Sequence, residues 1–196
     1  MAKGHMKDGA GMGRPSSSYV IVVTSLDSGE EGKIAIGSVI DGHFDPSLKA
    51  GDFVSFSPIY DSSVDGFIAD QVKPDSSIRG VLVTGNVPKI TVAQGMACVV
   101  SNANVAGNIV MDGGLLLVAD NSVITGKIKA LTNSVQVTIM DSTCKDVVKV
   151  QSTTAGSCFI AKNSSFAGTI KLSPNMSALC IQSCNVADVV LRADQP

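Results

Sequence analysis

One eight-residue phrase recurs five times in the second half of the chain, and its spacing restricts the fold more than any other feature. Each copy begins with small, mostly polar residues, passes through a Gly or Asp and leads into an apolar strand. The copies occupy residues 102–109, 121–128, 141–148, 163–170 and 183–190. Their Gly or Asp positions are separated by 19, 20, 22 and 20 residues. A period near twenty, filled with strand-forming residues, is too short for a helical repeat and indicates an array of short strands.

The phrase has the chemistry of a corner between two strands. Side chains of Asn, Asp and Ser bond nearby backbone groups at a turn, and Gly permits a positive φ angle. We therefore predict structural turns at Gly107, Gly126, Asp146, Gly168 and Asp188. The fourth residue of each copy is expected to face one core, as a ladder of Val105, Ile124, Cys144, Phe166 and Val186. Two short strands and two turns per repeat favour a β-solenoid, and an antiparallel meander of hairpins remains the alternative.

The first half of the chain also has the pattern of strands, without the twenty-residue period. Residues 19–24, 33–39 and 53–56 are rich in β-branched residues or alternate apolar and polar residues. Turn residues and prolines separate them, which predicts a small β-barrel or roll. No segment combines helical apolar periodicity with helix caps, so we predict an all-β protein. The expected parts are a flexible arm over residues 1–18, a barrel domain over 19–96 and a repeat domain over 97–196.

The first eighteen residues have the composition of a mobile arm. They are rich in Gly and Ser, and they carry Lys3, Lys7 and Arg14 against the single acidic residue Asp8. Such a composition is typical of a disordered terminus. The alternative is an arm that becomes ordered on an acidic neighbouring subunit, with the three basic side chains as its contacts.

The charge of the chain disfavours nucleic acid as a partner. The net charge is −2, with 8 basic and 11 acidic groups in residues 1–96 and 7 and 6 in residues 97–196. No basic stretch interleaved with aromatic residues is present, although nucleic-acid binding usually relies on one. Charged residues make up 16% of the chain and hydrophobic residues 44%, a balance that favours a surface covered by another protein.

Membrane insertion and export are not expected either. The longest apolar stretches, residues 19–23 and 115–119, are far shorter than the roughly 18 residues that a spanning helix needs. Residues 1–15 lack the apolar core of a signal peptide. We therefore expect a soluble protein that is not exported by the usual route.

The sequence offers no convincing set of catalytic or metal-binding residues. The five cysteines form no CxxC pair, and only His5 and His43 could complete a zinc site, so we predict no metal. His43 lies between Asp41 and Asp45 in a segment with turn character, and a catalytic role for it is disfavoured. Phosphate-binding glycine motifs are also absent, so we predict no cofactor and no enzymatic activity.

Four segments in and after the expected barrel carry a family resemblance. They are Ala-Gly-Asp-Phe-Val at residues 50–54, Val-Asp-Gly-Phe-Ile at 64–68, a Gly-Val strand within 77–83 and a Thr-Val strand with a Gly within 90–100. Their order is similar to that in tailed-phage head-decoration (capsid-stabilising) proteins, over about residues 30–100. The resemblance implies a protein that binds the outside of a capsid where major capsid subunits meet, often as a trimer with an extended arm. It also implies a location on the virion surface.

The repeat region alone resembles bactofilins, bacterial proteins whose right-handed β-helix polymerises end to end. That resemblance implies a self-assembling scaffold in the bacterial cytoplasm. A surface- or carbohydrate-binding module is a third alternative, although aromatic residues for stacking on sugars are scarce. Our first hypothesis is a structural virion protein, a homotrimer that binds the major capsid protein or other assembly subunits and neither nucleic acid nor membrane.

Overall fold

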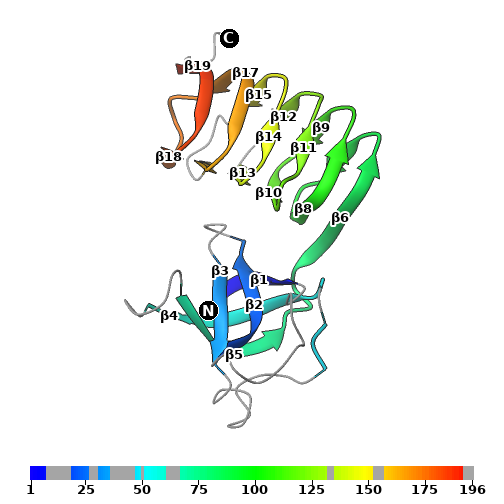
Figure 1. The fold of residues 1–196 in the computed structure, drawn as a ribbon, viewed down its shortest axis with the longest axis vertical. Coiled ribbons are helices and arrows are strands. Elements are labelled where there is room, and N and C mark those ends of the chain that lie inside the picture. Colours follow the sequence, from blue (N-terminus) through cyan, green and yellow to red (C-terminus); the bar gives the residue numbers. More distant parts are fainter. Residues whose placement is uncertain are drawn as a thin grey trace. The chain divides into compact units, whose positions relative to one another are not determined.

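The computed structural model describes residues 1–7, 19–26, 31–35, 47–49, 51–60, 67–131, 135–151 and 157–191. Every helix or strand in these residues is a β-strand, so the all-β prediction is confirmed. No helix in the described part is long and apolar enough to cross a membrane. The chain divides into two compact units, Met1–Ile78 and Arg79–Pro196, drawn in Figure 1.

The first unit is a closed barrel in which the strand order is β1-β2-β3-β5-β4. Its strands are β1 (Ala2–Lys7), β2 (Tyr19–Ser25), β3 (Glu31–Ala35), β4 (Phe53–Ile59) and β5 (Phe67–Pro74). Neighbouring strands are antiparallel except β3 and β5, which are parallel. Buried Val54 and Phe56 alternate with more exposed residues along β4, as expected for a strand with one face in the core. The rings of Phe56 and Phe67 stack with centroids 5.2 Å apart at the centre of this core.

The predicted arm over residues 1–18 is wrong for its first part. Strand β1 pairs with both β2 and β4, and it is therefore an integral part of the barrel. Gly4 and Met6 are buried and alternate with exposed Lys3, a period of two that the Gly-rich composition masks. Lys3 and Lys7 accordingly belong to a barrel strand rather than to an arm. Arg14 lies outside the described residues.

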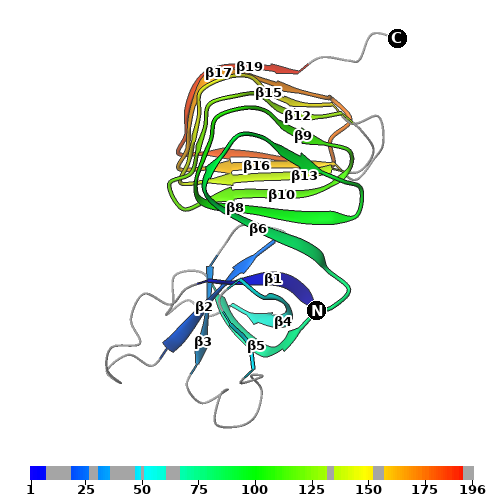
Figure 2. The same ribbon diagram turned by 90° about the vertical axis from the view of Figure 1, so that its right-hand side faces the viewer.

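The second unit is a parallel β-solenoid of about five turns, which confirms the solenoid over the meander. Its strands form three faces, which Figure 2 shows nearly end-on. The first face contains the start of β6 (Arg79–Val87), the start of β8 (Met96–Val105), β10 (Gly114–Ala119), β13 (Val135–Met140), β16 (Cys158–Lys162) and β18 (Ala178–Gln182). The second face contains the ends of β6 and β8, β11 (Val123–Ile124), β14 (Thr143–Cys144) and the starts of β17 (Ser165–Leu172) and β19 (Asn185–Leu191). The third face contains β7 (Ile90–Val92), β9 (Ile109–Met111), β12 (Ile128–Ala130), β15 (Val148–Val150) and the ends of β17 and β19.

The solenoid begins earlier than the sequence predicted. Residues 79–96 were assigned to the barrel domain, yet β6 pairs in parallel with β8 and β7 pairs in parallel with β9. These strands form the first rung, and the boundary between the units precedes Arg79. The last two segments of the phage-family resemblance, within residues 77–83 and 90–100, therefore contribute β6, β7 and part of β8 to the solenoid.

The solenoid interior is an almost entirely aliphatic core. Alternate side chains of the strands point inward, and the core includes Ile109, Leu116, Ile128 and Val137, all fully buried. Close packing of such side chains, stacked rung on rung, supplies the main favourable term in folding. The two aromatic residues of this unit, Phe159 and Phe166, are also buried there.

Candidate functional site

The predicted ladder residues lie in register on the second face. Val105 pairs with Ile124, Ile124 with Cys144, Cys144 with Phe166, and Phe166 with Val186. The first four side chains are at most 2% exposed, whereas Val186 in the last rung is half-buried. Val87 pairs with Val105 and extends the ladder into the first rung, which sequence reasoning missed because this rung lacks the full phrase.

Positive φ angles occur at the first residue of the phrase and not at its glycine. The corner between the first and second faces holds Asn102, Asn121, Asp141, Asn163 and Ser183 at φ angles of 49°, 60°, 46°, 50° and 53°. Asn and Asp are the non-glycine residues that adopt this left-handed conformation most readily. The left-handed backbone conformation therefore explains why four of the five copies begin with Asn or Asp.

The glycines of the phrase are required for a different reason, which is the close approach of stacked corners. A Cβ atom on Gly126 would lie 2.3 Å from the backbone of Gly107, and one on Gly107 would lie 2.3 Å from the carbonyl oxygen of Pro88. A Cβ atom on Gly168 would lie 2.5 Å from the carbonyl carbon of Asp146. Our prediction that these glycines serve to permit positive φ was wrong, since none of the three has a positive φ.

The two aspartates predicted at the same corner differ from each other. Asp146 occupies the corner itself, and its Oδ1 accepts a hydrogen bond of 2.7 Å from the backbone N–H of Val147. Asp188 pairs with Thr169, because the register shifts by one residue after Phe166. The last copy is thus one residue shorter than the others at this point, and Asp188 does not occupy the position equivalent to Gly168.

Buried serines form a second ladder beneath the first corner. Ser122, Ser142 and Ser164 are the second residues of their copies, and each is at most 5% exposed. Ser122 Oγ donates to the carbonyl of Ala119 at 2.6 Å and accepts from the N–H of Ala103 at 3.2 Å. Ser164 Oγ likewise accepts from the N–H of Ser142. The hydroxyls therefore join each corner to the rung before it and satisfy buried backbone groups.

The described residues contain no cluster suited to metal binding. Among them, no group of three or more His, Cys, Asp or Glu side chains could hold a metal ion. The five cysteines are free, and burial raises the pKa of the Cys98 thiol to about 11 and that of Cys144 to about 12. Thiols of this kind are inert at neutral pH. His43 lies outside the described residues.

The third face carries a column of three lysines. Lys129, Lys149 and Lys171 lie on β12, β15 and β17 and pair in register. Adjacent strands lie about 4.8 Å apart, and two ammonium groups at that separation repel by about 1 kcal/mol in water. Lys127 lies beside the column, and the four lysines line a groove of about 300 Å³. Among the described residues no acidic side chain lines this groove or forms an ion pair with these lysines.

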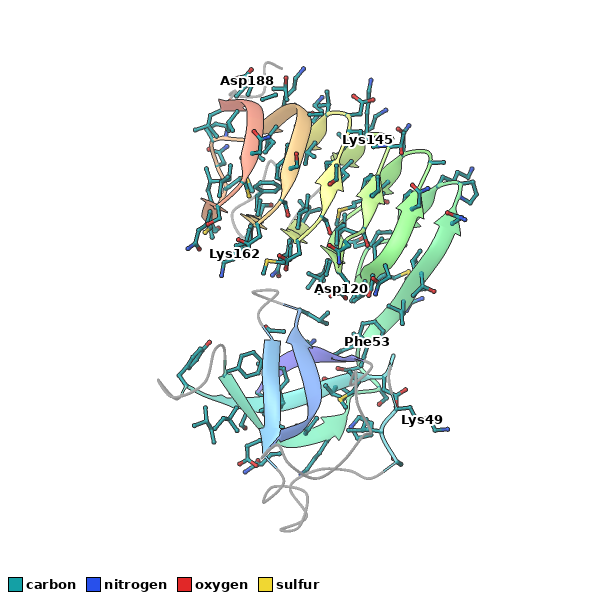
Figure 3. The ribbon with its side chains drawn as sticks, viewed as in Figure 1. Lys49, Phe53, Asp120, Lys145, Lys162 and Asp188 are labelled. Atoms are coloured by element: carbon teal, nitrogen blue, oxygen red, sulfur yellow. The ribbon has the colours of Figure 1, made fainter. Side chains whose placement is uncertain are left out.

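The lysine column was not predicted, although the sequence contains its signal. Lys129, Lys149 and Lys171 are separated by 20 and 22 residues, the same steps that separate the corners of their copies. These lysines form no local cluster in the sequence, whereas a solenoid brings together residues one period apart. Figure 3 shows another lysine, Lys145, on the side of the solenoid opposite Asp120 and Lys162.

A second concave surface lies along the first corner and is polar, with Asp141 as the charged residue among its described lining residues. Asn121, Asp141 and Asn163 border it together with Ser183 and Asn185, and its volume is about 450 Å³. Its side chains are short, and the serines next to it are occupied by the backbone hydrogen bonds of the buried ladder. The lysine groove is therefore the surface of the solenoid with the most specific chemistry.

Comparisons with known proteins found no match. No protein-family profile matches the chain, and neither a curated protein nor a solved structure is significantly similar to it.

Proposed function

We propose that the chain is a structural protein that attaches to the outside of a tailed-phage capsid. The observation that carries the proposal is the continuous parallel pairing of the solenoid strands, from β6 to β19, in a chain that also contains a closed barrel. A stack of parallel strands is rigid, and each rung contacts mainly its neighbours. Such a body presents long, flat faces and suits attachment better than chemistry.

Part of the sequence resemblance to head-decoration proteins lies in the first unit. The segments at residues 50–54 and 64–68, which carry that part, include the first residues of β4 and β5. We propose that the protein acts as a homotrimer and that its partner is the major capsid protein. No reaction is assigned to it.

Virions purified from the source culture provide the test. An antibody against the chain should detect it in intact particles at a fixed ratio to the major capsid protein. Mild dissociation should release it as a trimer, measured by sedimentation equilibrium. Its absence from purified particles, or its presence only as a minor component of cell debris, contradicts the proposal.

The last rung favours a second candidate, end-to-end assembly of solenoids into a scaffold. In the described residues, β18 pairs only with β16, and β19 pairs only with β17, so the outer edge of each is open. Leu179 and Leu191 on these strands are 46% and 58% exposed. An open, apolar strand edge is a template for pairing with another chain. The occupant in this candidate is a second copy of the protein.

Negative-stain microscopy and concentration-dependent sedimentation distinguish this scaffold from a capsid-bound trimer. A scaffold forms filaments without any partner, and the double variant Leu179→Lys, Leu191→Lys should abolish them. If the wild type and the double variant both form closed trimers and no filaments, the scaffold candidate is contradicted.

A further inference from the structure

The charge of the solenoid differs in sign from that of the barrel. Met1–Ile78 contains six Lys and Arg residues against eleven Asp and Glu, whereas Arg79–Pro196 contains nine against six. The solenoid is therefore basic, although the net charge of the whole chain is close to zero. Four of its nine basic side chains line the groove on the third face.

The groove is narrow and runs along the solenoid axis. Within the column, Lys129 is followed toward the first rung by Val110, and Lys171 is followed toward the last rung by Val190. The positive charge is thus confined to the three successive strands β12, β15 and β17, with Lys127 to one side. A ligand that matches it carries its negative charges in single file, with a step near the spacing of about 4.8 Å between strands.

The chemistry of the side chains restricts the charged groups of that ligand. Among the described residues that line the groove, the cations are lysines and none is an arginine. Arginine binds both carboxylates and phosphates through two parallel hydrogen bonds, whereas lysine binds as a point charge that requires no planar geometry. A column of such point charges suits tetrahedral sulfate and phosphate groups, whose oxygens point in several directions. The volume of about 300 Å³ is that of a small-ligand pocket and suits a short stretch of polymer.

Nucleic acid fits the groove less well than a non-aromatic polyanion. Single strands are bound through aromatic side chains on which the bases stack. Both aromatic residues of the solenoid, Phe159 and Phe166, are in the core and at most 2% exposed. A duplex presents two phosphate strands, and the groove offers one column of cations. Val147, Gln151 and Leu172 line the remaining surface next to the lysines.

We propose that this groove binds a linear polysaccharide that carries sulfate or phosphate groups, laid along the solenoid axis across β12, β15 and β17. Lys129, Lys149 and Lys171 contact successive anionic groups, and Lys127 contacts a group at the side. Binding of the polyanion relieves the repulsion among the three stacked ammonium groups. The proposal rests on the groove alone and does not depend on attachment to a capsid.

The test uses the full chain and fluorescein-labelled dextran sulfate, with affinity measured by fluorescence anisotropy at low salt. The groove variant Lys129→Gln, Lys149→Gln, Lys171→Gln should lose at least tenfold in affinity. The matched control Lys49→Gln, Lys73→Gln, Lys145→Gln removes three exposed charges elsewhere and should change affinity by less than twofold. Lys129→Arg, Lys149→Arg, Lys171→Arg retains the charge and should retain most of the binding, which separates lost contacts from lost folding. Rising salt should weaken the wild type more steeply than the groove variant.

Competing probes decide the class of ligand. Phosphorylated dextran should compete with dextran sulfate, which identifies the phosphate or sulfate source by relative affinity, and neutral dextran should not compete. Tighter binding of inorganic polyphosphate, single-stranded DNA or polyglutamate overturns the assignment to a polysaccharide. Equal loss of affinity in the groove variant and the control variant overturns the site, as does salt-sensitive self-association that the groove variant abolishes.

Discussion

The barrel and the solenoid are both built from strands alone, yet they differ in how far apart in the chain paired residues lie. In the barrel, Ala2 pairs with Phe56, and β3 pairs in parallel with β5 across a long connection. In the solenoid, each pairing joins residues roughly one repeat apart, such as Ile124 with Val105 and Cys144. The barrel closes on itself around a small core, whereas the solenoid is a stack with two ends.

This difference predicts two kinds of cooperativity. A closed barrel loses its ring of hydrogen bonds when any one strand leaves it. The stability of a solenoid is approximately a sum over rungs and the interfaces between adjacent rungs. Central rungs have neighbours on both sides, while the described last rung contacts only the rung before it. Substitutions should therefore have effects that depend on their position along the stack.

The largest effect is expected for Ile124→Asp at the centre of the ladder. Ile124 is fully buried between Val105 and Cys144, and an unpaired carboxylate there costs several kcal/mol. We expect the solenoid to unfold, observed as loss of its amide signals in NMR spectra while those of the barrel remain. Val186→Asp, in the half-buried last position of the same ladder, is the matched control and should leave the solenoid folded. Loss of both units with Ile124→Asp shows that they fold as one.

The second-largest effect is expected for Gly126→Ala, which tests whether close stacking of corners explains the glycines. The new Cβ would lie 2.3 Å from backbone atoms of Gly107, so the rungs must move apart, and we expect a loss of about 3 kcal/mol. Gly95→Ala is the control, because a Cβ atom on Gly95 would meet open space and the strain would come from its φ angle of +72° alone. It should lower the free energy of unfolding by about 1 kcal/mol. If urea denaturation shows equal losses in the free energy of unfolding for the two variants, the close contact between corners does not explain the requirement for glycine at position 126.

The repeated part of the molecule, the solenoid, was the part that could be predicted from the sequence. A solenoid must place the same kind of residue at the same slot in each rung, so the slots of Val105, Ile124 and Phe166 were visible as a period. The barrel has no such period, and β1 was hidden in a Gly-rich segment in which Met6 is the large buried side chain among those that the structure describes. The first rung was missed because β6 lacks the complete phrase.

The candidate site could not be predicted from local sequence alone. Lys129, Lys149 and Lys171 are isolated charges in the chain and become a column only when the register of β12, β15 and β17 is known. The reason for the glycines could not be predicted from the sequence either. The close approach of Gly126 to the backbone of Gly107 occurs between two adjacent rungs. Composition suggests that a glycine is needed, and only the stacked backbone shows why.

An intermediate effect is expected for Ser122→Ala in the serine ladder. Its hydroxyl accepts from the buried N–H of Ala103 and donates to the carbonyl of Ala119. The substitution removes the hydroxyl partner of the Ala103 N–H, while the Ala119 carbonyl keeps its backbone bond from the Ser122 N–H. We expect a loss of about 2 kcal/mol in the free energy of unfolding, measured by urea denaturation. Thr125→Ala, three residues later with an exposed side chain, should change stability by less than about 0.5 kcal/mol. A loss no larger than that of the control means that water replaces the hydroxyl at the corner.

The smallest effect concerns pH and separates the two units again, since all five cysteines belong to the solenoid. Burial raises the pKa of Cys98 to about 11 and that of Cys144 to about 12, above the value of 9.0 expected for an exposed thiol. The folded state therefore holds these protons longer than the unfolded state. The stabilisation, complete below pH 9, is lost as the pH rises toward 11 for Cys98 and toward 12 for Cys144. At pH 10 each thiol should lower the free energy of unfolding of the solenoid by about 1.4 kcal/mol. Cys144→Val should remove about half of this alkaline loss, since valine occupies the same ladder position in Val105 and Val186. If the loss persists undiminished in that variant, groups other than the buried thiols set the alkaline limit of the solenoid.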